Sequence, residues 1–152
     1  MIDINLIRTN PELVKENIRK KFQDHKLPLV DRALELDAKR RALIAEGDAL
    51  RSARNTLSKQ VGMLMKAGNK EEAEKVKAQV KADADRLLAI EAESADVEAE
   101  LKKTMMTIPN IIDPTVPIGK DDSENVEIQR YGEPVVPEFE VPYHAEIMEK
   151  LN

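Results

Sequence analysis

Apolar residues recur with a period of seven through the middle of the chain. One series places a leucine at every seventh position: Leu29, Leu36, Leu43, Leu50, Leu57 and Leu64. A second position follows four residues after each of the first five leucines: Ala33, Arg40, Gly47, Arg54 and Val61. This spacing is typical of a coiled-coil seam and predicts a long helix over residues 29–66.

A second series with the same period follows the first. Its main positions are Ala73, Val80, Leu87, Ser94, Leu101 and Ile108. Companion positions lie three residues after the first five: Val76, Asp83, Ile90, Val97 and Thr104. This series predicts a helix over residues 71–106, and the Gly-Asn signal in "KAGNK" predicts the turn that joins the two helices.

The two series fit an antiparallel hairpin that folds between Gly68 and Asn69. In that register the numbers of facing residues sum to 137, so that Leu36 faces Leu101. Facing layers then match in size along the seam. The sequence therefore predicts a two-helix coiled coil rather than a compact globule, which suits a chain of 152 residues with only 3% aromatic side chains.

Two charged residues, Arg54 and Asp83, occupy seam positions that face each other in this register. Either alone would place a charge on an apolar seam. Together they can form an ion pair, and a buried polar pair is better attested for fixing register than for adding stability. We therefore expect Arg54 and Asp83 to form a structural register pair.

Shorter segments flank the predicted hairpin. Asn10 before Pro11 is a good helix start and predicts a short helix over residues 11–21. Its apolar side chains, and two that precede it, are expected to pack on the base of the hairpin: Ile4, Ile7, Leu13, Val14 and Ile18. The stretch "TIPNIIDPTVPIG" carries three prolines in thirteen residues and should end the second long helix. We accordingly divide the chain into a helical arm, 1–108, and a following region, 109–152.

Charge is distributed unevenly along a chain whose net charge is −5. Residues 49–82 carry eight basic and three acidic side chains, whereas residues 83–103 carry three basic and seven acidic ones. The positive charge thus lies at the turn end of the hairpin. Seven of its basic residues lie outside the seam and are candidates for binding phosphate: Arg51, Lys59, Lys66, Lys70, Lys75, Lys77 and Lys81.

Two interpretations of this basic end remain open. It can be a solvated face that only keeps the helices soluble, or it can bind a nucleic-acid backbone by displacing counterions. The predicted hairpin contains no aromatic residue, which argues against single-strand binding by base stacking. A nucleic-acid partner should therefore be a structured duplex that is recognised by its shape.

The remaining residues offer little chemistry. The two histidines, His25 and His144, are far apart in a chain without cysteine, so we predict no metal site. "PIGKDD" lacks the upstream glycine and the hydroxyl residue of a phosphate loop, and no set of catalytic residues can be proposed. Signal-peptide and membrane-spanning patterns are also missing, which predicts a cytoplasmic protein.

Three stretches in order carry a family resemblance: "MIDINLIRTNPELVKENIRKK", "ELDAKRRALIAEGDALRSARNTLSKQVG" and "TIPNIIDPTVPIGKDDSENVEIQRYGEP". Together they resemble the start of a bacterial-type seryl-tRNA synthetase. In that family a helical hairpin projects from a class II catalytic domain and grips the long variable arm of serine-specific tRNA. The resemblance gives the basic end of the hairpin a function.

The same resemblance gives an expectation for the region after the arm. "NVEIQRYGEP" should be an early strand and turn of the catalytic domain, and "PYHAEIMEKLN" should begin its first helix. The family's ATP-binding and serine-binding motifs have no counterpart in this chain, so we expect a truncated, inactive fragment without cofactor. For the whole enzyme the resemblance implies ATP, magnesium and a homodimer formed through the catalytic domain.

A second class of function stays open beside the first. A coiled coil of this kind can be a non-catalytic interaction or chaperone-like module. Such a module should expose apolar residues at its tip, where the sequence offers only Met63 and Met65 beside several lysines.

Overall fold

The computed structural model describes residues 2–133 and 135–151, and the chain forms two compact units, Met1–Lys120 and Asp121–Asn152. The first unit contains four helices: α1 (Ile4–Thr9), α2 (Pro11–Lys20), α3 (Leu27–Lys66) and α4 (Lys70–Thr107). The second contains α5 (His144–Leu151), and a short 3-10 turn is present in each unit, at Asp24–Lys26 and Asp122–Glu124. The mainly helical fold class predicted from the sequence is confirmed.

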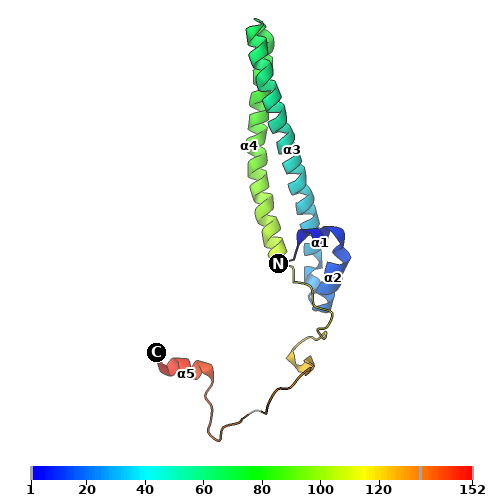
Figure 1. The fold of residues 1–152 in the computed structure, drawn as a ribbon, viewed down its shortest axis with the longest axis vertical. Coiled ribbons are helices and arrows are strands. Elements are labelled where there is room, and N and C mark those ends of the chain that lie inside the picture. Colours follow the sequence, from blue (N-terminus) through cyan, green and yellow to red (C-terminus); the bar gives the residue numbers. More distant parts are fainter. Residues whose placement is uncertain (1, 134, 152) are drawn as a thin grey trace. The chain divides into compact units, whose positions relative to one another are not determined.

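Helices α3 and α4 lie side by side as an antiparallel hairpin (Figure 1). With 40 residues in α3, the hairpin is roughly 60 Å long at about 1.5 Å per residue. Both helices extend one or two residues beyond most of the predicted limits. Periodicity locates the middle of a helix better than its ends, because the terminal residues contribute little to the seam.

The turn between the long helices is closed by backbone hydrogen bonds around Gly68. The N–H of Asn69 donates to the carbonyl of Leu64 at 3.0 Å, and the N–H of Gly68 donates to that of Met65 at 3.3 Å. Gly68 has a φ of +79°, a left-handed conformation that glycine adopts without steric cost. This Schellman motif satisfies the last carbonyls of α3 and lets α4 start two residues later.

The observed register agrees with the predicted one. A Cβ atom on Gly47 would lie 3.8 Å from Cγ2 of Ile90, its predicted partner. Leu36 and Leu43 of α3 share one buried cluster with Ile90 and Val97 of α4. Gly47 therefore occupies the layer where the seam needs its smallest residue.

The predicted ion pair between Arg54 and Asp83 is not formed in the described residues. Asp83 is buried, but its Oδ1 accepts a hydrogen bond from Nε2 of Gln79 at 2.7 Å. Arg54 is exposed. Gln79 lies one turn before Asp83 on the same helix, so it reaches the carboxylate without ordering a long arginine side chain from the other helix.

The base of the hairpin carries a second core, formed by two short helices rather than the one predicted. The segment before Asn10 forms α1, capped by Asp3, and Asn10 then caps α2 by accepting the N–H of Leu13 at 3.2 Å. The side chains of this core come from the N-terminal segment, the two short helices and the base of the hairpin: Ile2, Ile7, Val14, Ile18, Val30, Ala33, Met105 and Ile108. Each fully buried Ile or Val contributes about 1.5–3 kcal/mol relative to an exposed one.

The chain leaves α4 along α2, where Asn17 holds it. The side chain of Asn17 is buried; its Nδ2 donates to the carbonyl of Asn110 at 3.0 Å, and its Oδ1 accepts the N–H of Ile112 at 2.7 Å. One amide side chain thus satisfies two backbone groups of a segment that has no secondary structure of its own. The proline-rich segment is therefore fixed where it begins.

The second unit departs from prediction in one element. Helix α5 forms where a helix was expected, and Gly132 has the positive φ of a turn. The predicted strand in residues 125–131 does not form, since a strand needs a neighbouring strand and none occurs in the described parts of the chain. Pro134 and Asn152, at the ends of the two predicted pieces, lie outside the described residues.

Candidate nucleic-acid interface

Three ion pairs along one flank hold the lower half of the hairpin. They repeat at heptad spacing on both helices: Arg32–Glu100 at 2.6 Å, Lys39–Glu93 at 2.7 Å and Arg86–Glu46 at 2.7 Å. We call this set the ladder. The hydrogen bond from Arg86 lowers the pKa of Glu46 below its ordinary value. The ladder ends at this pair, so the hairpin beyond it relies on other contacts.

Arg51 marks the opposite flank. Its guanidinium contacts Asp48 at 3.1 Å on its own helix and Glu91 of α4 at 3.8 Å. The two residue numbers of each ladder pair add up to 132, those of facing seam residues to 137, and those of Arg51 and Glu91 to 142. The ladder and the Arg51–Glu91 pair therefore lie on opposite sides of the seam. These pairs therefore assign each helix position to one flank or the other.

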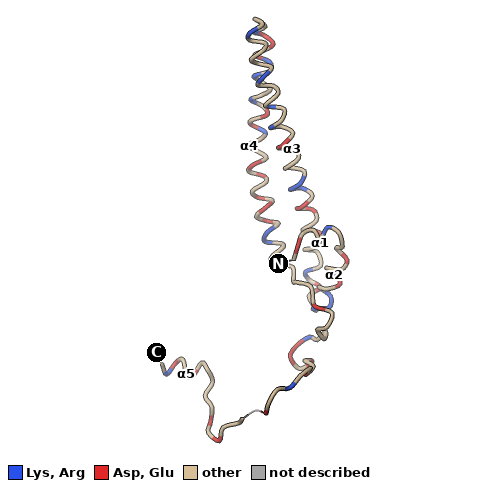
Figure 2. The backbone as a smooth tube through the Cα atoms, viewed as in Figure 1, with Lys and Arg blue, Asp and Glu red and all other residues tan. Residues whose placement is uncertain are grey.

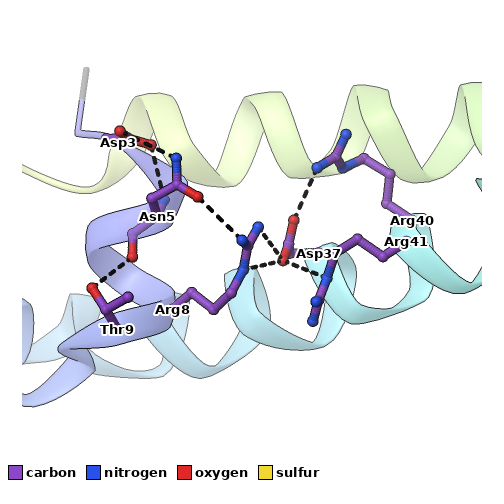
Figure 3. A network of polar contacts seen from close by, with 7 residues as sticks. All are labelled: Asp3, Asn5, Arg8, Thr9, Asp37, Arg40 and Arg41. Carbon is purple, nitrogen blue, oxygen red and sulfur yellow. Dashed lines mark hydrogen bonds and ion pairs between the residues drawn. The ribbon is translucent and has the colours of Figure 1, made fainter.

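A buried acid anchors the short helix α1 to the base of α3. Asp37 is 1% exposed and accepts from three arginines, as Figure 3 shows: Arg8 at 2.9 Å, Arg40 at 3.1 Å and Arg41 at 3.2 Å. Burial raises the pKa of Asp37, but hydrogen bonds from Arg40 and Arg8 outweigh it and hold this pKa below its ordinary value. The network braces the base from which the arm extends.

Packing becomes sparse toward the turn. The last buried residue of α3 is Gly47, and beyond it Leu50, Leu57, Val61 and Leu64 remain only half-buried. The distal hairpin consequently presents most of its surface to solvent. Its faces, rather than a cavity, are available to a partner.

All seven predicted phosphate-binding residues are exposed, and they lie in the distal half of the hairpin, where basic residues are concentrated (Figure 2). Lys77 pairs with Glu74 at 2.6 Å, and Lys75 lies 3.9 Å from Glu71. Four lysines form no ion pair within the described part of the chain: Lys59, Lys66, Lys70 and Lys81. The structure thus brings the seven to one end of the hairpin but distributes them around it.

A shallow hollow of about 210 Å³ lies on one side of the distal hairpin. Ser58 and Val61 of α3 and Lys77 and Val80 of α4 line it. Ser58 lies two turns after Arg51, which places the hollow on the flank of Arg51 and opposite the ladder. Ser58 could not be singled out from the sequence, because an isolated serine on a helix gives no signal.

The ladder and the Asp37 network were not predicted from the sequence either. The ladder had a detectable signal, namely opposite charges at seven-residue spacing beside each seam. Asp37 had only its spacing to Arg40 and Arg41, and its link to Arg8 depends on how α1 packs. Both features are structural, and neither adds a group that could carry out a reaction.

The described residues offer neither a metal site nor a membrane-spanning helix. No group of three or more His, Asp or Glu side chains among them is placed to hold a metal ion. None of the described helices is long and apolar enough to cross a membrane. His25 and His144 are both exposed.

Comparison with known proteins places this geometry among relatives. A family model described as the seryl-tRNA synthetase N-terminal domain matches residues 1–112. The chain is 42% identical over 152 residues to a serine–tRNA ligase of Caldicellulosiruptor saccharolyticus, covering 100% of this chain and 35% of that protein. It is 37% identical over 146 residues to one of Methanoculleus marisnigri, covering 95% of this chain and 34% of that protein.

Solved structures give the same picture. Seryl-tRNA synthetase from Pyrococcus horikoshii, complexed with ATP, matches with a TM-score of 0.79 and 35% identity, over 87% of this chain and 29% of that one. Cytoplasmic serine–tRNA ligase from Naegleria fowleri, in complex with AMP, matches with a TM-score of 0.69 and 28% identity, over 99% and 40%. The chain spans about one third of the length of the curated relatives it matches.

Proposed function

Since the chain belongs to the family of seryl-tRNA synthetase N-terminal domains, we propose that its hairpin is a tRNA-binding arm that grips the long variable arm of serine-specific tRNA. The observation that carries the proposal is the concentration of exposed basic residues at the turn end of the hairpin. Clustered lysines and arginines neutralise backbone phosphates and release counterions without reading bases. The arm would position tRNA for attachment of serine by the catalytic domain of the whole enzyme.

The free lysines support this role over that of a solvated face. Lys59, Lys66, Lys70 and Lys81 have no acidic partner in the described residues, so a phosphate would not have to displace one. The hairpin contains no aromatic residue on which bases could stack. A double-helical stem, recognised by its shape and backbone, is therefore the expected target.

We assign the remaining properties to the whole enzyme. ATP and magnesium would be bound by the catalytic domain of the whole enzyme, as the family resemblance implies. A homodimer would form through that domain as well. We also propose that the enzyme acts in the cytoplasm as a serine–tRNA ligase, and that this chain alone does not activate serine.

The alternative interaction or chaperone-like function has less support. The large apolar side chains exposed near the turn are Met63, at 62%, and Met65, at 47%. These two methionines are two residues apart on one helix and point to different sides, so each is a small apolar surface compared with the patches by which proteins bind one another.

Binding of a labelled serine-specific tRNA to this chain, followed by fluorescence anisotropy, tests the proposal. Affinity should fall roughly 3.5-fold per neutralised phosphate as salt rises from about 50 to about 200 mM. Removing the variable arm of the tRNA should weaken binding more than changing its sequence.

Two variants, one at the tip and one at the base, provide the control. Their losses of affinity are compared per lysine replaced, because the first removes six charges and the second three. Replacing the six tip lysines by Gln (Lys59, Lys66, Lys70, Lys75, Lys77 and Lys81) should nearly abolish binding. The same change at Lys20, Lys102 and Lys103, which are exposed near the base, should have little effect. Equal affinity of the tip variant and the unmodified protein at low salt would show that the basic end is only a solvated face.

A further inference from the structure

The distal hairpin has two flanks that differ in shape and in charge. The flank on the side of Arg51 includes the hollow lined by Ser58, Val61, Lys77 and Val80. The helix repeat adds neighbouring positions one or two turns away on each helix. We call this surface the Ser58 face; it comprises Asn55, Ser58 and Gly62 of α3 and Lys70, Lys77 and Lys81 of α4.

The opposite flank, on the side of the ladder, is poor in charge over residues 49–82. There the heptad positions carry one acid and one base, Glu72 and Lys75, among small or uncharged side chains. The flank of the Ser58 face carries Arg51, Lys70, Lys77 and Lys81 over the same residues against the single acid Glu74, which pairs with Lys77. Charge on the distal hairpin is therefore asymmetric across the seam.

Two residues on the α3 side of the Ser58 face, Asn55 and Ser58, have short polar side chains, whereas Met65, one heptad after Ser58, is long and 47% exposed. Asn55 and Ser58 are exposed and can donate hydrogen bonds to phosphate or ribose oxygens. Gly62 lies one turn after Ser58, and a Cβ atom placed on it would meet no atom within 4 Å. Packing within the arm thus gives no reason for a glycine at this position.

Gly62 also lowers the helix propensity of α3, because glycine is among the poorest helix formers. A glycine that is unfavourable for the helix and faces open space permits close approach of another backbone. Of the lysines of α4, Lys77 lines the hollow, together with Ser58 of α3. This combination suits a sugar-phosphate backbone lying along α3 with its charge facing α4.

We propose that the Ser58 face, and not the whole circumference of the tip, is the surface that contacts the RNA stem. The proposal rests on the proposed function and specifies which side of the arm carries it. Lys70 and Lys81 neutralise phosphates, and Lys77 does so by exchanging Glu74, with which it pairs at 2.6 Å, for a phosphate. Asn55 and Ser58 donate hydrogen bonds to the RNA backbone, and Gly62 leaves room for it. Lys59 and Lys66, on the outer side of α3, and Lys75, on the opposite flank, contribute only long-range attraction.

Two triple variants with equal loss of charge test the assignment. One replaces Lys70, Lys77 and Lys81 by Gln, and the other replaces Lys59, Lys66 and Lys75 by Gln. The first should weaken binding of a serine-specific tRNA transcript by roughly tenfold more than the second, and should reduce the salt slope by roughly 0.9 for each phosphate that is no longer neutralised. Lys and Gln have similar helix propensities, so both variants should keep their helicity.

The outcomes separate this inference from the function on which it rests. Equal losses of affinity in the two triples, or a larger loss in the second, would overturn the Ser58 face but leave tRNA binding by the tip intact. No loss in either triple would overturn both proposals.

Gly62→Ala gives a second readout that a purely structural role would not produce. The added methyl group should raise the thermal midpoint of the arm, because alanine favours the helix, while weakening binding of the same transcript several-fold. A variant that is more stable and binds equally well would contradict close approach at Gly62. Ala53→Ser, on the opposite flank, is the control and should leave affinity unchanged.

Discussion

Oδ2 of Asp37 in α3 lies 2.9 Å from Nη2 of Arg8 in α1, so one buried carboxylate joins two helices through residues that are 29 positions apart in the sequence. Arg40 and Arg41 approach the same carboxylate from the following turn of α3. The acid is buried while its arginines remain partly exposed. The network therefore depends on Asp37 more than on any one arginine.

Asp37→Asn should destabilise the protein by about 1–3 kcal/mol, because it removes the charge that three arginine side chains share. Urea unfolding followed by circular dichroism would measure the loss. Asp48→Asn is the matched control: its carboxylate also pairs with an arginine but is 69% exposed, so its effect should stay within about 0.5 kcal/mol. Equal effects of the two substitutions would contradict the anchoring role of Asp37.

The same carboxylate should make stability depend on pH in acid. The pKa of Asp37 is lowered in the folded protein, so the unfolded state binds the proton more readily. The stabilisation is fully present above the ordinary pKa of 3.8 and is lost as pH falls from there through the lower folded value. The difference in stability between the unmodified protein and Asp37→Asn should therefore shrink over that range, and a constant difference would oppose this account.

Asn17→Ala should release the segment that leaves α4. The substitution removes the acceptor of the Ile112 N–H and the donor to the Asn110 carbonyl. We expect faster hydrogen exchange at Ile112 and a loss of roughly 2 kcal/mol in stability, since a buried bonded amide is removed. Asn55→Ala, at an exposed helical position, should leave exchange at Ile112 unchanged and should not lower stability, because alanine is the better helix former.

Gly68→Ala should destabilise the hairpin by about 1 kcal/mol, because alanine at a φ of +79° brings its Cβ close to the backbone. Gly62→Ala on the same hairpin should have the opposite sign, as its backbone is helical and its surroundings are open. Thermal unfolding of the two variants compares them directly. A shift of the same sign in both would conflict with the turn geometry.

Arg86→Glu should lower the thermal midpoint by placing two acids together where Arg86 now binds Glu46 at 2.7 Å. Combining it with Glu46→Arg should restore most of the loss, because the pair is re-formed with its charges exchanged. High salt should narrow the differences between the variants, since both partners are partly exposed. Failure of the double variant to recover would mean that the loss came from something other than this pair.

The long helices, their turn and their register were predictable because a coiled coil repeats one contact many times. A period that recurs over five or more heptads survives a polar residue such as Arg54 on the seam. The role given to Arg54 was a single contact, and it was wrong because Gln79 competes for Asp83 from the same helix. Repetition carries information that one pair of residues does not.

Contacts between segments far apart in the sequence were the least predictable. Helix α1 has six residues, too few for a periodic signal, and it exists because Ile7 packs against the base of the hairpin. From the sequence, Asn17 looks like an ordinary surface residue, and only the structure shows that the segment after α4 packs against it. The concentration of basic residues near the turn could be predicted from the sequence. The assignment of those residues to two flanks required the observed pairing of Arg51 with Glu91.

The ladder also fixes how far the turn lies from the base. In the observed register Lys39 faces Glu93 and Glu46 faces Arg86. A slip of one heptad in one direction would bring Lys39 against Arg86, and in the other direction Glu46 against Glu93, so either slip sets like charges together. A slip of one heptad would move the turn by three to four residues, or roughly 5 Å. In the first two pairs of the ladder the basic residue is on α3, whereas in the third it is on α4. This exchange disfavours a slip in either direction and so keeps the arm at a single length.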